Sequence, residues 1–319
     1  MKKHIYIYSP SSAVRDKSAF KRGLSRLIEL GYDVEVDKDA LATHMRFAGD
    51  DEMRLSSIQR AAGSGADIAL ISRGGYGLSR ILPSIDYKAV AKAVSNGTKF
   101  VGFSDFTALQ MALLAKTGAV SWAGPALGED FGRAAGSDDI MEACFNDLVT
   151  GQGEGSGWRI PKVDVASTAI TTDGIDAELS NHASKLENSI LWGGNLSILV
   201  SLLGTPYLPA VKGGILFIED VGEHPYRIER MLCQLLQAGV LAQQKAIIFG
   251  QFSNYQLTPH DKGYKLASVI NWLRGLVKAS VFTGLPFGHV ATKVLLPVGL
   301  PVTLAVEGRD AFLLWSHHH

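Results

Sequence analysis

The sequence predicts an α/β fold built as two units, a parallel β-sheet covered by helices and then a second mixture of strands and helices. In the first part of the chain, short apolar runs rich in β-branched side chains alternate with longer stretches of helical periodicity. A glycine-rich segment then interrupts this alternation. The chain of 319 residues is also longer than one ordinary domain of roughly 100 to 200 residues. We therefore expect two domains.

The first domain, residues 1–150, is expected to contain a parallel sheet with helices on both faces. Its strands are predicted at residues 5–8, 33–36, 68–71 and 98–103. Its helices are predicted at residues 18–30, 51–62, 87–95, 106–116 and 140–149. Ligands of such sheets bind beyond the carboxyl ends of the strands, so candidate functional residues are sought there.

Residues 151–157, Gly-Gln-Gly-Glu-Gly-Ser-Gly, are predicted to be a linker, because so many glycines make a regular element costly. We assign residues 151–185 to the linker region and residues 186–316 to a second, β/α domain. Strands after the linker are predicted at residues 159–165, 175–179, 214–219, 246–250, 294–297 and 302–306. Helices are predicted at residues 195–203, 226–238 and 264–276.

The balance of charge excludes several classes of partner. Lys+Arg 31 and Asp+Glu 31 cancel, so no broad attraction to nucleic acid or to anionic lipid is expected. Apolar runs fall short of the about 18 residues needed to span a bilayer, and we expect a cytoplasmic protein with no membrane partner. Cys144 and Cys233 are interpreted as core residues, and the final three histidines as a remnant of a purification tag.

The segment Gly102-Phe103-Ser104-Asp105-Phe106 carries the first chemical signal. An apolar strand ends in Gly-x-Ser and passes directly into a helix, a context that exposes a serine hydroxyl at the carboxyl edge of a sheet. Backbone N–H groups at the start of that helix could stabilise an oxyanion. Taken alone, however, the segment is explained better if Ser104 is simply a helix N-cap.

A second glycine-rich turn, Arg73-Gly74-Gly75-Tyr76-Gly77, follows the strand predicted at residues 68–71. Its glycines allow the backbone to approach a ligand closely, which suits an N–H donor aimed at a carbonyl oxygen. The turn matches neither G-x-G-x-x-G nor a Walker A motif, so it does not favour nucleotide binding. Ordinary surface pairing explains Arg73 and the nearby Arg80 equally well.

A serine nucleophile requires a base and an acid that orients it. Six histidines remain when the final three are discounted, and His289 is the most suggestive, since it follows an apolar turn. Glu219 ends an apolar strand, where a carboxylate is costly unless paired, although Asp220 and Glu223 are close alternatives. Because no H-E-x-x-H motif or close His/Cys pair occurs, no metal site is expected.

Taken together, these residues resemble the L,D-carboxypeptidases of murein recycling, a family that also includes microcin-immunity hydrolases. The resemblance spans nearly the whole chain. It rests on residues 73–77 with 79–82, 102–107, 124–125, 192–196, 204–207, 219–220, 223–232 and 288–289, on Lys293, and on residues 296–299.

The resemblance implies a flavodoxin-like amino-terminal domain joined to a swivelling β/α carboxyl-terminal domain, with the site at their junction, in a protein that forms a homodimer. It implies that Ser104 is the nucleophile, Glu219 the acid and His289 the base of a Ser-Glu-His triad. The backbone N–H groups of Asp105 and Gly75 would form the oxyanion hole. No cofactor is implied.

The reaction implied is cleavage of the bond between the L-centre of meso-diaminopimelate and the terminal D-alanine of murein tetrapeptides. Candidate substrate-binding residues are Arg73, Gly74, Tyr76, Arg80, Asn195, Arg227 and Lys293, of which the basic ones could hold the free carboxylate. One alternative is a hydrolase of peptidyl- or aminoacyl-adenylate antibiotics, which would need an aromatic side chain to stack on adenine. Only Trp158 is available between residues 150 and 185, and packing explains it better. A catalytically silent binder of murein fragments or nucleotides is the other alternative.

Overall fold

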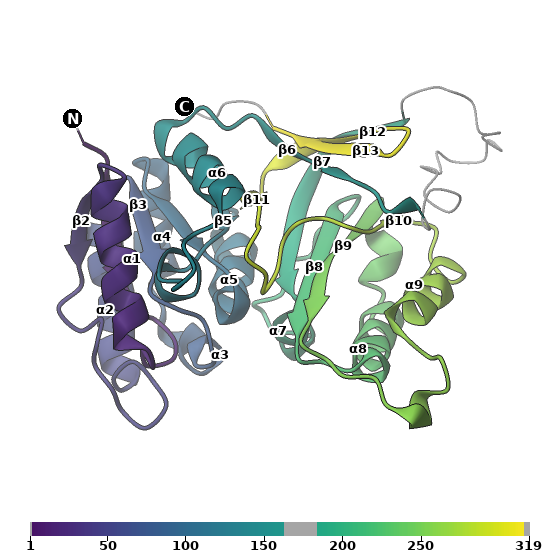
Figure 1. Ribbon diagram of the computed structural model, residues 1–319, viewed down its shortest axis with the longest axis horizontal. Helices are drawn as coiled ribbons and strands as arrows, with labels where there is room; N and C mark the ends of the chain where they lie inside the picture. Colours follow the sequence, from purple (N-terminus) through teal and green to yellow (C-terminus); the bar gives the residue numbers. More distant parts are fainter. Residues whose placement is uncertain (1, 163–183, 316–319) are drawn as a thin grey trace.

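The computed structural model describes residues 2–162 and 184–315, which form two α/β lobes lying side by side (Figure 1). The amino-terminal lobe is built on a six-stranded sheet with the order β11-β5-β4-β3-β1-β2. The carboxyl-terminal lobe is built on a seven-stranded sheet with the order β10-β9-β8-β7-β12-β13-β6. The predicted fold class, α/β with parallel strands in two units, is confirmed.

The amino-terminal sheet is parallel except at one edge. Its parallel strands are β1 (His4–Tyr8), β2 (Asp33–Val36), β3 (Ile68–Ile71), β4 (Lys99–Gly102) and β5 (Ser121–Ala123). Its helices are α1 (Lys17–Glu29), α2 (Asp51–Gly63), α3 (Leu78–Ile81), α4 (Tyr87–Ser95), α5 (Thr107–Thr117) and α6 (Asp139–Thr150). The period of two along β1 sends Ile5 and Ile7 into one core with α1 and α6, and Tyr6 and Tyr8 into the other.

Aspartate side chains determine where four of these helices begin. Asp16, Asp50, Asp86 and Asp138 each accept a hydrogen bond from a backbone N–H in the first turn of α1, α2, α4 and α6. This N-cap bond satisfies a donor that has no partner within the helix and stabilises it by about 1 kcal/mol. These caps explain why the predicted starts of the four helices agree with the structure to within about one residue.

The carboxyl-terminal sheet combines a parallel half with an antiparallel half. The parallel strands are β7 (Ser184–Asn195), β8 (Ile215–Val221), β9 (Ala246–Ser253) and β10 (Ser280–Phe282). The antiparallel extension consists of β12 (Pro301–Glu307), β13 (Asp310–Leu314) and β6 (Gly155–Arg159). Helices α7 (Leu196–Ser201), α8 (Pro225–Gln237) and α9 (Leu266–Arg274) complete the lobe.

Strand β11 (Leu296–Val298) corrects one prediction. Residues 294–297 are predicted to belong to the second domain, but β11 pairs antiparallel with β5 and completes the amino-terminal sheet. Leu296 and Val298 are fully buried there. The physical reason is that β5 would otherwise be an uncovered edge strand, and the returning chain supplies both its hydrogen bonds and its apolar cover.

Strand β6 (Gly155–Arg159) corrects the prediction of a linker. Residues 151–157 are predicted to be a linker, but the second half of this segment lies in β6. Gly157 pairs with Phe312 and Gly155 with Leu314, and a methyl group added at Gly157 would lie 3.0 Å from Phe312 Cδ1. The side chains of Phe312 and Leu314 therefore lie against these two exposed glycines, and the space that a larger side chain would need is already occupied. The predicted strand at residues 175–179 lies outside the described residues, as does most of the one at residues 159–165.

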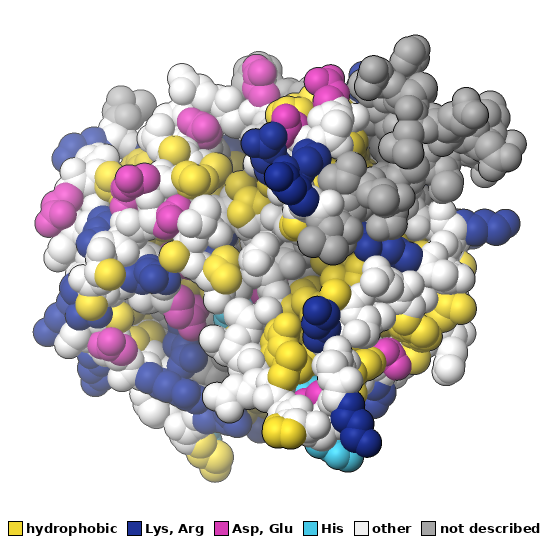
Figure 2. Space-filling model, turned by 45° about the vertical axis from the view of Figure 1, so that its right-hand side comes forward, with side chains coloured by type: hydrophobic (Ala, Val, Ile, Leu, Met, Phe, Trp, Pro, Cys, Tyr) yellow, Lys and Arg dark blue, Asp and Glu magenta, His cyan; other side chains and the backbone are white. Residues whose placement is uncertain are grey.

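Acidic and basic side chains are both scattered over the face of the molecule drawn in Figure 2, in keeping with the zero formal charge. In the described ranges, 2–162 and 184–315, no helix has the length and apolar character needed to cross a membrane. The same residues contain no group of three or more His, Cys, Asp or Glu side chains arranged to hold a metal ion.

Candidate active site

Ser104 lies on a sharp turn between β4 and α5. Its backbone is left-handed, with φ of 63°, a conformation that is costly for a residue other than glycine. The short 3-10 turn η2 (Ser104–Phe106) has Phe103 as its N-cap and no side-chain cap bond, so Ser104 is not the helix cap considered above. A methyl group added at Gly102 would lie 2.7 Å from Ile71 Cδ1, which explains the glycine before the turn.

The turn from Arg73 to Gly77 packs directly onto this serine. A methyl group added at Gly74 would lie 2.7 Å from Ser104 Cβ and 2.9 Å from its Oγ. Gly75 has φ of 101°, which a glycine adopts without strain. The backbone of the turn therefore reaches the serine side chain only because residue 74 has none.

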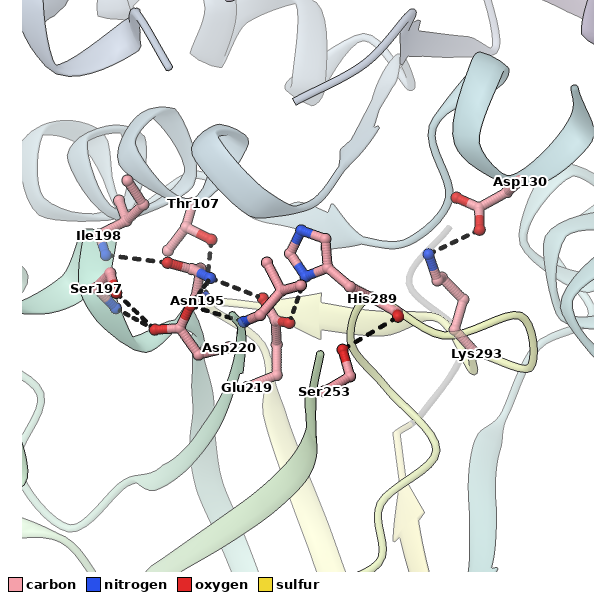
Figure 3. Close-up of polar contacts among 11 residues, drawn as sticks. Thr107, Asp130, Asn195, Ser197, Ile198, Glu219, Asp220, Ser253, His289 and Lys293 are labelled. Atoms are coloured by element: carbon pink, nitrogen blue, oxygen red, sulfur yellow. Dashed lines mark hydrogen bonds and ion pairs between the residues drawn. The ribbon is translucent and has the colours of Figure 1, made fainter. Parts of the chain in front are cut away.

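His289 and Glu219 meet at the carboxyl edge of the other sheet (Figure 3). His289 Nδ1 lies 2.8 Å from Glu219 Oε2, and the side chain of Glu219 is 0% exposed. Gly288, with φ of 142°, permits this approach, since a methyl group there would lie 2.8 Å from Gln251 O and 3.1 Å from Glu219 Oε2. The carboxylate thereby binds the Nδ1 edge of the imidazole, and the His289 side chain is still 19% exposed.

The imidazole also lies against the segment that carries Ser104. The ring centroids of His289 and Phe103 are 4.9 Å apart, and Phe103 immediately precedes the serine. Within residues 2–162 and 184–315 no hydrogen bond joins Ser104 to His289, as is common for catalytic pairs before substrate binds. The structure thus places His289 next to the residue that precedes Ser104, without a hydrogen bond between His289 and Ser104.

The protonation of His289 depends on its neighbours. Burial lowers the pKa of His289. The hydrogen bond and negative charge of Glu219, together with the charge of Glu129, raise this pKa by more than burial lowers it, so the net shift is upward. The Nδ1–H group of the imidazole donates to Glu219, which leaves Nε2 as the atom able to accept a proton when the ring is neutral.

Asn195 holds the other oxygen of Glu219. Its Nδ2 donates to Glu219 Oε1 at 3.2 Å and to Asp220 Oδ1 at 3.0 Å, while its Oδ1 accepts from Ile198 N at 3.1 Å. These contacts engage the whole amide of a buried side chain. The structure therefore favours a supporting role for Asn195 over the predicted contact with substrate.

The two alternatives to Glu219 have other partners. Asp220 Oδ2 accepts hydrogen bonds from the backbone and the hydroxyl of Ser197, at 2.9 and 2.7 Å. Burial raises the pKa of Asp220. Glu223 lies 3.7 Å from Arg227, near the protein surface. Of the acidic residues considered from the sequence, Glu219 alone is the one that contacts His289.

The four basic candidates differ in their surroundings. Arg80 is bound to Asp51 at 2.7 Å, and Arg227 is an exposed side chain beside Glu223. Lys293 is 1% exposed, forms an ion pair with Asp130 at 2.7 Å and lies 3.6 Å from the Phe103 ring centroid. Lys293 packs against Phe103 of the serine turn, and because it is buried and paired with Asp130 the predicted contact with substrate is not favoured.

Arg73 is the first residue of the glycine-rich turn that packs on Ser104. It is 17% exposed, donates to Ala13 O at 3.1 Å, and its Nε lies 3.7 Å from Glu129 Oε1. Tyr76, on the same turn, is an exposed side chain packed against Phe47 with ring centroids 6.0 Å apart. Arg73 and Tyr76 are therefore both at least partly exposed side chains of the turn that packs on Ser104.

The sequence does not single out Glu129 and Asp130, which lie on the π-helical turn η3 (Leu127–Phe131). Desolvation raises the pKa of Glu129, the charge of Asp130 raises it further, and Arg73, His289 and Lys293 oppose the shift. Asp130 Oδ2 also accepts from Ala126 N at 2.8 Å. No motif marks these residues, because their importance comes from partners that are distant in the sequence, such as Lys293 for Asp130.

Comparisons with known proteins agree with this arrangement. The model of the LD-carboxypeptidase N-terminal domain matches residues 5–124, and that of the LD-carboxypeptidase C-terminal domain matches residues 188–304. The probable murein peptide carboxypeptidase of Bacillus subtilis is 29% identical over 93% of this chain and 88% of its own length.

Solved structures agree as well. The muramoyltetrapeptide carboxypeptidase of Oxalobacter formigenes is 37% identical, covers 99% of this chain and 100% of its own, and superposes with a TM-score of 0.83. The microcin C7 self-immunity protein MccF, known from Escherichia coli, also superposes with a TM-score of 0.83 in complex with aspartyl sulfamoyl adenosine. It is 24% identical over 100% of this chain and 98% of its own, and so shares the fold. The chain belongs to the LD-carboxypeptidase family of peptidases.

Proposed function

We propose that the protein is a serine carboxypeptidase that releases D-alanine from murein tetrapeptides by cleaving the L,D bond after meso-diaminopimelate. The observation that carries the proposal is the His289–Glu219 pair, 2.8 Å apart, lying against Phe103 beside the left-handed Ser104. The names of the relatives from Oxalobacter formigenes and Bacillus subtilis support the choice of a murein peptide as substrate.

The first half of the reaction forms an acyl-enzyme. His289 Nε2 takes the proton of Ser104 Oγ, and the oxygen attacks the carbonyl carbon between the L-centre of meso-diaminopimelate and D-alanine. Backbone N–H groups of Asp105 and Gly75 stabilise the oxyanion. The tetrahedral intermediate then collapses, and the proton on Nε2 passes to the leaving nitrogen of D-alanine.

The second half restores the enzyme. Water enters, His289 Nε2 removes its proton, and the hydroxide attacks the ester carbonyl. Collapse of the second tetrahedral intermediate breaks the bond to Ser104 Oγ, which regains its proton from the imidazolium. The carboxylate of Glu219 stabilises the imidazolium in both halves without accepting a proton itself.

Recognition of the terminal carboxylate is assigned to Arg73. Arg73 begins the turn that packs on Ser104, and its side chain is 17% exposed, so it is shielded from much of the solvent but still reachable by a ligand. A planar guanidinium can bind a carboxylate with two parallel hydrogen bonds. Arg80 and Lys293 are each held by an acidic partner at 2.7 Å, whereas Arg73 lies 3.7 Å from Glu129. Arg227 is an exposed side chain of α8 in the other lobe.

Replacement of the nucleophile tests the proposal. Ser104→Ala is expected to lower the release of D-alanine by roughly 10⁴-fold or more, because the acyl-enzyme cannot form. Release is followed by mass spectrometry on murein tetrapeptide, and labelling by a fluorophosphonate serine probe is measured in parallel. Ser95→Ala, on the exposed end of α4, serves as the matched control. Turnover of Ser104→Ala near the wild-type rate would refute the proposal.

The adenylate-hydrolase alternative is tested with the same assay on an aminoacyl-adenylate. Trp158 does not favour it, because this side chain is buried and its indole N–H donates to Thr283 O at 3.0 Å. Labelling of Ser104 by the probe would dismiss a catalytically silent binder.

We also propose that the enzyme acts in the cytoplasm as a homodimer. Light scattering on the purified protein measures the mass in solution, and fractionation of the source cells measures the location. A monomeric mass at working concentrations would contradict the homodimer.

A further inference from the structure

Three loops meet where Ser104 is held, and hydrogen bonds from two adjacent serines connect them. The loops follow β1 at Ser11 and Ser12, β3 at the Arg73–Gly77 turn, and β4 at Phe103 to Asp105. All three lie at the carboxyl edge of the parallel sheet, where ligands of such folds bind.

The side chain of Asp105 ties the serine turn to the glycine-rich turn. It is 0% exposed. Its Oδ2 accepts a hydrogen bond from Leu78 N at 2.9 Å and another from the hydroxyl of Ser11. Leu78 directly follows Gly77, so one carboxylate oxygen holds the far end of the glycine-rich turn against the residue after the nucleophile.

Ser12 fastens the middle of the same turn. Its Oγ accepts from Tyr76 N at 2.9 Å and lies 3.1 Å from Tyr76 O, and its backbone N–H donates to Gly74 O at 3.4 Å. A methyl group added at Gly75 would lie 2.3 Å from Ser12 Oγ, so the hydroxyl also limits where Gly75 can move. Ser12 therefore restrains the residues on both sides of Gly75.

A turn with three glycines in five residues has little conformational preference of its own, and ordering it costs more entropy than ordering other residues. Oxyanion donors are effective only when they are held in advance at about 2.7–3.1 Å from the developing charge. An external restraint on this turn is therefore needed if Gly75 N–H is to act together with Asp105 N–H.

We propose that Ser11, Ser12 and the Asp105 carboxylate are positioning residues that fix the separation of the two oxyanion donors, Asp105 N–H and Gly75 N–H. The inference rests on the proposed function, since it assigns a task within the same acyl transfer. None of the three side chains needs to touch the substrate. Their effect is exerted through the backbone of residues 74–78 and 105.

The experiment compares Ser12→Ala and Asp105→Ala with the wild type in the tetrapeptide assay. Each is expected to lower kcat by about 10- to 100-fold with KM within about twofold, because a displaced donor is lost mainly in the transition state. A peptide boronic acid, which mimics the tetrahedral intermediate, is expected to bind more weakly by a similar factor. Asp105→Asn keeps an acceptor for Leu78 N and should restore most of the kcat.

Ser9→Ala provides the matched control. Ser9 is a buried serine of the same loop whose hydroxyl lies 2.7 Å from Ala40 O and 2.5 Å from Ser72 Oγ. Within the described part of the chain it therefore contacts the residue before the glycine-rich turn but makes no hydrogen bond to residues 73–78 or to Asp105. It should lower the melting temperature without changing kcat or boronate affinity. If Ser9→Ala lowers kcat as much as Ser12→Ala does, the role is merely structural and the inference is wrong.

The failure of this inference is distinguishable from that of the proposed function. An inactive Ser104→Ala combined with wild-type kcat and boronate affinity in Ser12→Ala and Asp105→Ala would overturn the positioning role alone. An active Ser104→Ala would overturn the acyl-transfer mechanism itself. If Asp105→Ala does not fold, kcat and boronate affinity of Ser12→Ala decide the question.

Discussion

Gly74→Ala adds one methyl group directly against the nucleophile. The new Cβ would lie 2.7 Å from Ser104 Cβ and 2.9 Å from Ser104 Oγ, with Phe103 O at 3.4 Å. The backbone of Gly74 is not among the positive-φ residues, so alanine introduces no strain of its own. The substitution therefore tests the contact between the glycine-rich turn and the serine, and little else.

The size of the effect follows from these distances. Non-bonded carbon atoms prefer separations of about 3.5–4.0 Å, so the turn and the serine must move apart by roughly 1 Å. A misplacement of about 1 Å at a reacting group costs about 100-fold in rate. We therefore expect Gly74→Ala to lower kcat for D-alanine release by about 100-fold while the protein stays folded, since the contact lies at the edge of the core.

The assay measures kcat and KM on murein tetrapeptide together with the melting temperature. Gly63→Ala is the matched control, because Gly63 also avoids positive φ and a methyl group there meets nothing within 4 Å. This control should keep the wild-type rate. A Gly74→Ala enzyme with kcat within about threefold of the wild type would show that the turn does not press on the nucleophile, and the oxyanion assignment of Gly75 would lose its support.

Two further outcomes are expected. Because the pKa of His289 is raised and only the neutral ring accepts a proton, kcat/KM should rise with pH through a midpoint above the usual value of about 6.5. Glu219→Gln should move that midpoint down in a pH–rate profile as well as lowering the rate; an unchanged midpoint would contradict the pairing. Arg73→Lys keeps the charge but loses the planar donor pair, so KM should rise roughly tenfold for the tetrapeptide. A substrate amidated at its carboxyl terminus should show no such rise, and equal effects on both substrates would remove the carboxylate role.

Local patterns were sufficient for much of the fold. The apolar runs of β1, β3 and β4 and the helical periodicity of α1, α2 and α5 lie where the sequence predicts them. Long-range pairing was not predictable in this way. Nothing within residues 294–298 tells that their partner is β5, about 170 residues earlier in the chain. Gly155 and Gly157 indicate a linker until Leu314 and Phe312 are known to be their strand partners.

The candidate site could likewise be predicted only where its residues are close together in the sequence. Ser104 and the glycine-rich turn are visible in the sequence because a strand, a turn and a helix are contiguous there. The choice of Glu219 over Asp220 cannot be made from the sequence, because both residues lie at the end of the same strand. Only their partners, His289 and Ser197, distinguish them. Glu129 has no local signal, since its surroundings come from three separate segments.

The geometry of the proposed triad is a property of the contact between the lobes. Asn195 N donates to Thr107 Oγ1 at 3.1 Å, which joins the end of β7 to the first residue of α5. The same Asn195 holds Glu219 Oε1, so Oε2 is left for His289 Nδ1, and the plane of the carboxylate is fixed by one partner on each oxygen. The serine turn leads directly into α5, which begins three residues after Ser104. The hydrogen bond that anchors Asn195 is therefore made to the helix that follows the nucleophile. Nucleophile and base are thus positioned by a continuous set of contacts, Thr107 to Asn195 to Glu219 to His289, and a shift of one lobe relative to the other would move both ends of that set.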